Sequence, residues 1–335
     1  MPMVPMKQIL EEAERGGYGV GAYNVNNMEQ VQAIMRAARE TNSPVIIQAS
    51  RGALKYTNLV YLKHLMYAAV EDNPNLKIAL HLDHGDKLET VKTAIALGFT
   101  SVMIDGSLKE DGKTPRSYQE NAEITRSVVE YAHQYGVTVE GELGTLGGIE
   151  EHIAASQVIL TDPQEAKRFI EYTGVDALAV AIGTSHGAYK FKAAPKLALE
   201  IVDQIHRLAP TTPLVMHGAS SVPQELIEKV NRYGGQLPGA MGVPIESIQQ
   251  AIKLGVRKIN VDTDSRLAMT GAIRQVFAEQ PQKFDPRDYL GPARDAIAEV
   301  IKGKMVAFGT AGHNDDYPPV TLDDVKLVYE ARGRL

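Results

Sequence analysis

The chain has 335 residues, of which 44 % are hydrophobic and 23 % are charged, as in an ordinary globular protein with a large core. Its formal net charge of −6 argues against general binding to nucleic acid or to anionic membranes. Because cysteine is absent, disulfides and thiolate metal ligands are excluded, so a transition metal must bind His, Asp or Glu. No apolar run reaches the roughly 20 residues of a membrane span, and the N-terminus lacks an apolar signal region. We therefore expect a cytoplasmic protein.

Short apolar runs alternate with longer amphipathic stretches along the chain. We interpret the runs as parallel strands covered on both faces, because most of them are apolar throughout. They lie at residues 18–25, 44–50, 77–84, 100–107, 138–144, 177–183, 213–220 and 257–264.

Helix signals separate these runs. Asn27 predicts the N-cap of a helix after the first run, and Asp162, followed by Pro163, predicts another helix start. Pro115 is expected to begin a helix that runs towards residue 136, and residues 264–279 have helical spacing. The polar segment 309–317 is expected to be loosely ordered. Eight strand–helix repeats without a break in composition predict one (β/α)₈ TIM barrel, a single domain of residues 1–335. A doubly wound open sheet is the alternative.

Polar residues collect at the C-terminal ends of the predicted strands, where the active site of such a barrel forms. Three histidines, His84, His186 and His217, lie at the ends of different strands. Three imidazoles that leave one position open are a known catalytic zinc arrangement. Each histidine alone would be read as a structural residue, but their matching positions favour a metal site. Zinc suits nitrogen ligands better than magnesium does, while iron, cobalt and manganese remain alternatives.

Two acids lie close to these histidines in the predicted barrel. Asp105 and Glu142 are interpreted either as ligands of a second cation or as partners that orient the histidines. A simple ion pair with a lysine is the competing interpretation.

Small-residue turns follow two of the histidine strands. Residues 183–187 (GTSHG) and 217–221 (HGASS) let the backbone approach an anion, and Lys190 adds charge nearby. Residues 260–264 (NVDTD), with Arg266 beyond them, supply polar groups that also fit an ordinary helix N-terminus. The glycine-rich segment 141–151 is expected to be a mobile loop that delivers Glu150 or Glu151 to a substrate, or else a solvated linker.

Six motifs in order resemble class II fructose-1,6-bisphosphate aldolases. They are HLDHG (81–85), SVMIDGS (101–107), EGELGTLGG (140–148), AIGTSHGAYK (181–190), LVMHGASS (214–221) and KINVDTDSRLA (258–268). The resemblance extends from AYNVN (22–26) to FDPRDYLGPAR (284–294), which is nearly the whole chain. Within the family, the chain looks most like the bacterial branch that also includes Calvin-cycle forms and tagatose-bisphosphate aldolases.

The resemblance implies a role for each matching residue. His84, His186 and His217 match the catalytic zinc ligands, Asp83 matches the proton donor, and Asp105 and Glu142 match a second metal position. Ser50 matches a contact to the glyceraldehyde-3-phosphate half, and Glu150 falls where the family's loop glutamate lies. The residues that match the phosphate and substrate cradle are Gly187, Gly218, Ala219, Ser220, Asn260, Val261, Asp262, Thr263, Arg266, Asp285 and Arg287, the last two across a subunit boundary.

The implied reaction is reversible, metal-dependent cleavage of fructose 1,6-bisphosphate, in glycolysis, gluconeogenesis or the Calvin cycle. The family also implies a monovalent cation (Na⁺ or K⁺) near the phosphate and a homodimer or homotetramer. Alternatives are the same chemistry on tagatose 1,6-bisphosphate, a non-catalytic sugar-phosphate-binding barrel, and a metal-dependent hydrolase.

Overall fold

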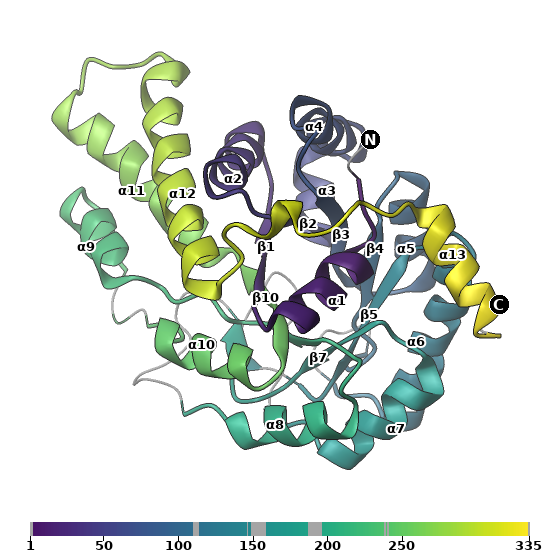
Figure 1. The fold of residues 1–335 in the computed structure, drawn as a ribbon. Coiled ribbons are helices and arrows are strands. Elements are labelled where there is room, and N and C mark those ends of the chain that lie inside the picture. The colour runs from purple at the N-terminus through teal and green to yellow at the C-terminus, as the bar shows by residue number, and fades with distance from the viewer. Residues whose placement is uncertain are drawn as a thin grey trace.

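The computed structural model describes residues 3–109, 114–145, 147–148, 159–186, 196–237, 239 and 241–333. Eight parallel strands close into a barrel in the order β1-β10-β9-β7-β5-β4-β3-β2 (Figure 1). Their bounds are β1 Val20–Asn24, β2 Val45–Ser50, β3 Ile78–Gly85, β4 Ser101–Ile104, β5 Thr138–Leu143, β7 Ala177–Val180, β9 Leu214–Met216 and β10 Val256–Val261. A separate two-stranded sheet joins β6 Gly147–Gly148 to β8 Ser185–His186. The predicted (β/α)₈ barrel is confirmed.

Each predicted strand overlaps one barrel strand, but several predicted strands are too long at the C-terminal end. The run 177–183 pairs only as far as Val180, and the run 213–220 only as far as Met216. Glycines with positive φ, Gly183 and Gly218, turn the chain away from the sheet soon afterwards. The last run was predicted too long because Thr263 already begins a helix.

Helices surround the barrel and alternate with its strands. Their bounds are α1 Met6–Gly16, α2 Met28–Thr41, α3 Arg51–Thr57, α4 Leu59–Asp72, α5 Leu88–Ala96, α6 Tyr118–His133, α7 Pro163–Thr173, α8 Leu199–Leu208, α9 Gln224–Arg232, α10 Ile245–Lys253, α11 Thr263–Glu279, α12 Pro286–Phe308 and α13 Leu322–Ala331. The predicted caps are present, since Asn27 accepts a hydrogen bond from the Gln30 amide and Asp162 from the Glu165 amide. The predicted start at Pro115 is wrong. Ser117 caps α6 in a capping box with Glu120, while Pro115 pairs with Leu108 in an isolated bridge.

One end of the barrel is closed by the chain termini. Helix α1 lies across the end that faces the viewer in Figure 1, with α13 beside it. The side chain of Gln8 in α1 bonds the backbone of Pro318 and Val320. The segment 309–317 is ordered, contrary to the sequence-based expectation. Asn314 is buried, and its side-chain oxygen accepts a hydrogen bond from the Lys77 amide at 2.9 Å. Long-range contacts of this kind hold a polar segment that local sequence describes as a loop.

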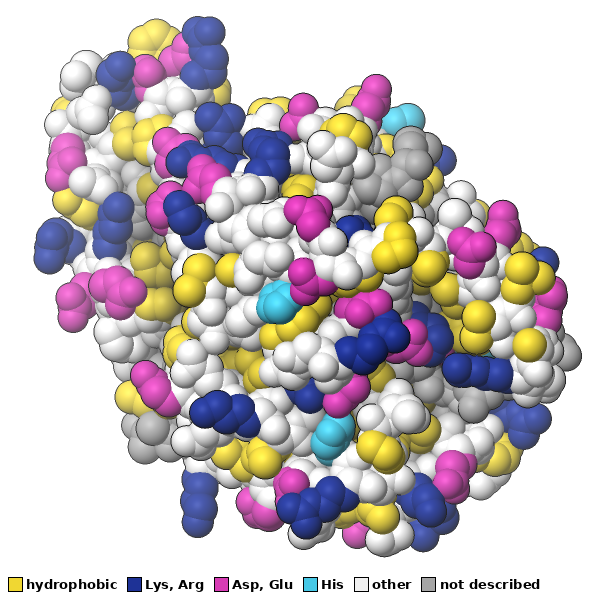
Figure 2. Space-filling model, viewed as in Figure 1, with side chains coloured by type: hydrophobic (Ala, Val, Ile, Leu, Met, Phe, Trp, Pro, Cys, Tyr) yellow, Lys and Arg dark blue, Asp and Glu magenta, His cyan; other side chains and the backbone are white. Residues whose placement is uncertain are grey.

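Helices α11 and α12 project from the barrel as a two-helix arm (Figure 1). Acidic and basic side chains are interspersed over the face seen in Figure 2, without a broad region of one sign. Among the described residues, no helix combines the length and the apolar character that a membrane crossing requires.

Candidate metal centre and active site

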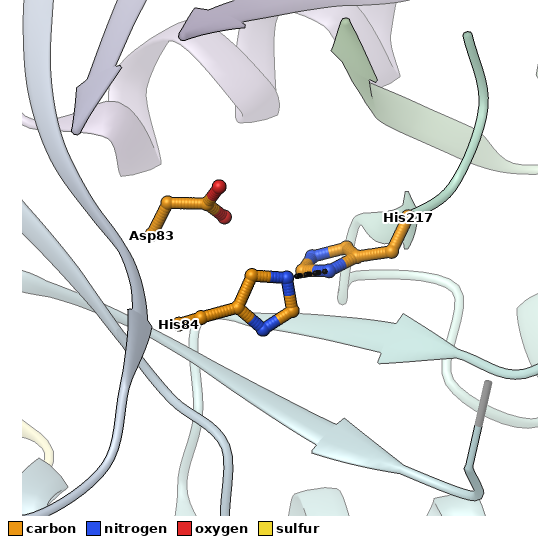
Figure 3. Close-up of side chains that lie close together, drawn as sticks. All are labelled: Asp83, His84 and His217. Carbon is orange, nitrogen blue, oxygen red and sulfur yellow. Dashed lines mark hydrogen bonds between the residues drawn. The ribbon is translucent and has the colours of Figure 1, made fainter. Parts of the chain in front are cut away.

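Three side chains at the ends of β3 and β9 converge at the open end of the barrel. Asp83, His84 and His217 present ligand atoms that all lie within 4.8 Å of one another (Figure 3). His84 Nε2 and His217 Nδ1 are 3.1 Å apart, and the two rings stand edge to face with centroids 4.7 Å apart. Two imidazole nitrogens that share a tetrahedral zinc ion would lie about 3.4 Å apart. The observed pair therefore fits a metal ion between the two rings.

A buried glutamate fixes the orientation of His217. Glu140 Oε1 lies 2.7 Å from His217 Nε2, and neither side chain is exposed to solvent. Because an ionised carboxylate only accepts, His217 donates from Nε2 and presents the Nδ1 lone pair towards His84. Burial lowers the pKa of His217, although Glu140 opposes this effect, and the neutral ring is the form that binds a metal.

A buried lysine, Lys258, contacts one partner of His217 and one partner of Asp83. Lys258 Nζ is 3.0 Å from Glu140 Oε2 and donates to Asn260 Oδ1 at 2.7 Å. Burial acts to raise the pKa of Glu140, but Lys258, His217 and His81 outweigh burial, and the net pKa is lowered. Since an ammonium group can only donate, Lys258 also forces the amide NH₂ of Asn260 to face Asp83. The ammonium group of Lys258 thus orients both Glu140, which contacts His217, and Asn260, which contacts Asp83.

The Asp83 carboxylate accepts hydrogen bonds from three amide side chains. Asn24 donates to Oδ2 at 3.0 Å, Gln48 to Oδ2 at 3.2 Å, and Asn260 to Oδ1 at 3.2 Å. Gln48 also donates to Asn24 Oδ1 at 2.7 Å, which fixes the orientation of that amide. The carboxylate is buried and held beside the histidines by β1, β2 and β10.

A second group of possible ligands adjoins His84. One ligand atom each from His84, Asp105 and Glu142 lies within 4.8 Å of the others. Burial acts to raise the pKa of Asp105, but His84 and Ser107 outweigh it and lower the pKa to about 2. Burial, with repulsion from Asp105, raises the pKa of Glu142 well above its usual range. The pair is suited to hold a cation, whose charge would offset this repulsion.

Several of the predicted substrate residues lie at the same end of the barrel. Ser50 ends β2 in register with Asp83 and caps α3. Gly218 has φ +59, Ala219 and Val261 are buried, and Ser220 Oγ accepts a hydrogen bond from the Asp262 amide. Thr263 begins α11, and Asp262 forms an ion pair with Arg266 one turn later.

Two predicted residues are not brought to the metal centre within this chain. Asp285 and Arg287 pair with each other at the start of α12, where the arm turns, and Arg287 is 89 % exposed. The turn between α11 and α12 lies at the far end of the arm in Figure 1. The backbone of His186 pairs with Gly148. Its side chain, together with Gly187, Lys190, Glu150 and Glu151, lies outside the described residues.

Four residues that shape this centre, Asn24, Gln48, Glu140 and Lys258, had no role assigned to them from the sequence. A signal was available, since Glu140 stands two residues before Glu142 and so shares its face of the strand. Polar residues at alternate positions of otherwise apolar strands point into the barrel here.

A barrel that holds histidines and acids at the C-terminal ends of its strands defines a metal-dependent barrel enzyme. Residues 4–313 match the family model described as fructose-bisphosphate aldolase class-II. A fructose-bisphosphate aldolase from Giardia intestinalis is 58 % identical and covers 98 % of this chain and all of that protein. A fructose-bisphosphate aldolase from Pseudomonas aeruginosa is 48 % identical, over 100 % of this chain and 99 % of that protein. The crystal structure of the YdjI aldolase from Escherichia coli K12 aligns with a TM-score of 0.75 at 28 % identity, over 93 % of this chain and all of that one. The chain belongs to the class II fructose-bisphosphate aldolase family.

Proposed function

We propose that the chain cleaves fructose 1,6-bisphosphate reversibly into dihydroxyacetone phosphate and glyceraldehyde 3-phosphate, with zinc held by His84, His186 and His217. The observation that carries this proposal is the convergence of Asp83, His84 and His217, in a chain that matches the family over nearly its whole length. When bound, the cation supplies Lewis acidity that stabilises the negative charge left beside the C2 carbonyl by C3–C4 cleavage.

Asp83 is the proposed base in cleavage and acid in condensation. It takes the C4 hydroxyl proton of the bisphosphate and returns it to the aldehyde oxygen in the reverse direction. The amide groups of Asn24, Gln48 and Asn260 hold its carboxylate in place, which lowers the cost of orienting it for each proton transfer. Glu150 is the proposed loop acid that exchanges the C3 proton, with Glu151 as the alternative.

The phosphate cradle is proposed at the residues that follow β8, β9 and β10 in the chain. Gly187, Lys190, Gly218, Ala219, Ser220 and residues 260–263 would hold the dihydroxyacetone phosphate half, with a monovalent cation beside it. Ser50 and Arg266 would contact the other half. The exposed pair of Asp285 and Arg287 at the turn of the arm supports a role across a subunit boundary in a homodimer or homotetramer. Asp105 and Glu142 would bind a second divalent ion. We place the single-domain enzyme in the cytoplasm, in glycolysis, gluconeogenesis or the Calvin cycle.

A coupled assay for triose phosphate release tests the proposal. Purified protein is given fructose or tagatose 1,6-bisphosphate, with and without a chelator and added zinc. We expect release from the fructose compound, loss of release with the chelator, and recovery with zinc. Faster turnover of tagatose bisphosphate would change the substrate. Release of inorganic phosphate without triose phosphates would indicate a hydrolase and contradict the proposal.

A further inference from the structure

His84 occupies a backbone conformation that is unfavourable for a non-glycine residue. Its φ is +51°, in the left-handed region, where the side chain crowds the backbone. The residue lies near the end of β3, immediately after Asp83. A conformation of this cost persists only where surrounding contacts impose it.

The geometry of β3 explains why the conformation is needed. In a regular strand successive side chains point to opposite faces. Ala79 packs in the barrel interior and Asp83 bonds interior amides, whereas Leu80 and Leu82 pack in the cluster shared with the helices. By this alternation His84 would point outwards with Leu82. Instead its ring reaches His217, which contacts the interior residue Glu140.

A β-bulge supplies the extra residue that changes the alternation. Leu82 pairs with Val102, but the next pair is Gly85 with Ile104, so β3 uses one residue more than β4. The bulge turns His84 towards the interior site that Asp83, its neighbour in the chain, already faces. The proposed metal ligand therefore lies beside the proposed proton carrier because of one local distortion of the strand.

Two sets of contacts hold the bulge. On the β4 side, the Gly85 carbonyl accepts a hydrogen bond from the Asp105 amide at 2.9 Å. Gly85 also packs closely there, since a Cβ on it would lie 2.5 Å from the Met103 carbonyl oxygen. On the other side, Arg51 Nε donates to the carbonyl oxygen of His84 at 3.1 Å.

The guanidinium of Arg51 is itself held in place. Its Nη1 lies 2.9 Å from Asp86 Oδ2, and Asp86 Oδ1 accepts a hydrogen bond from the Thr90 hydroxyl at 2.6 Å. Thr90 belongs to α5, and Arg51 is the first residue of α3. The planar guanidinium therefore links two helices to the carbonyl of the left-handed residue, through two donors whose relative direction is fixed.

We propose that Arg51, held by Asp86, is a positioning residue for the metal site. It stabilises the left-handed backbone of His84 and so places the rings of His84 and His217 at metal-binding separation. The inference rests on the proposed metal site, but not on the identity of the substrate. It assigns Arg51 no contact with substrate.

Zinc affinity of the full-length protein tests the role without any turnover. Metal is removed and the Kd for Zn²⁺ is measured by competition with a chromophoric chelator, for the unaltered protein, Arg51→Met and Arg51→Lys. We expect about tenfold weaker binding for both variants. Arg51→Lys keeps the charge but loses the fixed angle between the two donors. Arg126→Met is the matched control, because Arg126 makes an exposed ion pair with Glu130 on α6, and it should bind zinc as the unaltered protein does.

Two further measurements separate positioning from a general loss of structure. The visible spectrum of the Co²⁺-loaded Arg51→Met protein should differ from that of the unaltered protein, because the ligand geometry changes. The effects of Arg51→Met and Asp86→Asn on the Kd should be less than additive, because both act through the same contact. Unchanged zinc affinity and an unchanged Co²⁺ spectrum in both Arg51 variants would refute the proposal. A raised KM with unchanged zinc affinity would also refute it, because Arg51 would then be a substrate contact. Absence of aldolase activity in the unaltered protein would contradict the proposed function and leave this test intact.

Discussion

Replacing Glu140 by Gln isolates the contribution of the buried ion pair beneath the metal centre. The change keeps the shape and a hydrogen-bond acceptor for His217 Nε2, but it removes the negative charge 3.0 Å from Lys258 Nζ. Both side chains are fully buried, so the ammonium is left without a compensating charge. Removal of one partner from a buried pair costs about 3–5 kcal/mol.

This cost converts into a measurable shift of the melting temperature. With roughly 2 cal/mol/K of unfolding entropy per residue, a chain of 335 residues has an unfolding entropy near 0.7 kcal/mol/K. The metal-free Glu140→Gln protein should therefore melt about 4–7 °C below the unaltered protein. Its zinc affinity should fall by about 10- to 100-fold, because a neutral amide orients and polarises His217 less than a carboxylate does.

Differential scanning calorimetry of the metal-free proteins and chelator competition give the two quantities separately. The double variant Glu140→Gln/Lys258→Met should regain most of the lost melting temperature, since no unpaired charge remains, while its zinc affinity stays low. Glu130→Gln is the control, because Glu130 pairs with Arg126 on the exposed face of α6 and should change the melting temperature little. If Glu140→Gln melted at the same temperature as the control, the buried charge pair would not stabilise the fold, and the reasoning would fail.

Three further outcomes are expected. Asp83→Ala should lower kcat in the triose phosphate assay by about 10²- to 10⁴-fold while zinc affinity is retained, and near-normal turnover would exclude it as the proton carrier. Borohydride added with substrate should leave no covalent adduct in the mass spectrum, whereas a modified lysine would show a Schiff-base mechanism. Burial acts to raise the pKa of Asp176, but His133 and Lys7 outweigh it, and the pKa is about 2 instead of 3.8. The ionised carboxylate therefore adds about 2 kcal/mol of stability above pH 4, lost as the pH falls towards 2, and Asp176→Asn should flatten the pH dependence of urea unfolding in that range.

The elements that local sequence specifies were predictable. The alternation of apolar runs and amphipathic stretches gave eight strands in the right order, and the caps at Asn27 and Asp162 lie where side-chain acceptors precede helical spacing. The convergence of His84, His217 and Asp83 followed from a general property of barrels, since all strand ends of one polarity meet on one face.

Features that depend on distant partners were not predictable. His133 lies in a helical stretch whose local sequence does not name its partners, and the structure shows it buried, 2.9 Å from Asp176 and stacked on Tyr329 of α13. Lys258 looked like the start of a strand, and its local sequence does not indicate that Glu140 is its partner inside the barrel. The local sequence also gives no signal of the bulge at His84, because the bulge arises from the mismatch between two strands and not from either strand alone.

The pairing of the first barrel strand with the last has a consequence for how the protein is made. Val20 of β1 lies beside Lys258 of β10, so the nascent chain must be extended by more than two hundred residues before this partner exists. At ribosomal speeds of about 5–20 residues per second, the free edge of β1 waits roughly 12–50 seconds. An unpaired parallel edge is a template for pairing with other chains. Residues 20–24 therefore present one unpaired edge during translation, an exposure that the closed barrel no longer displays.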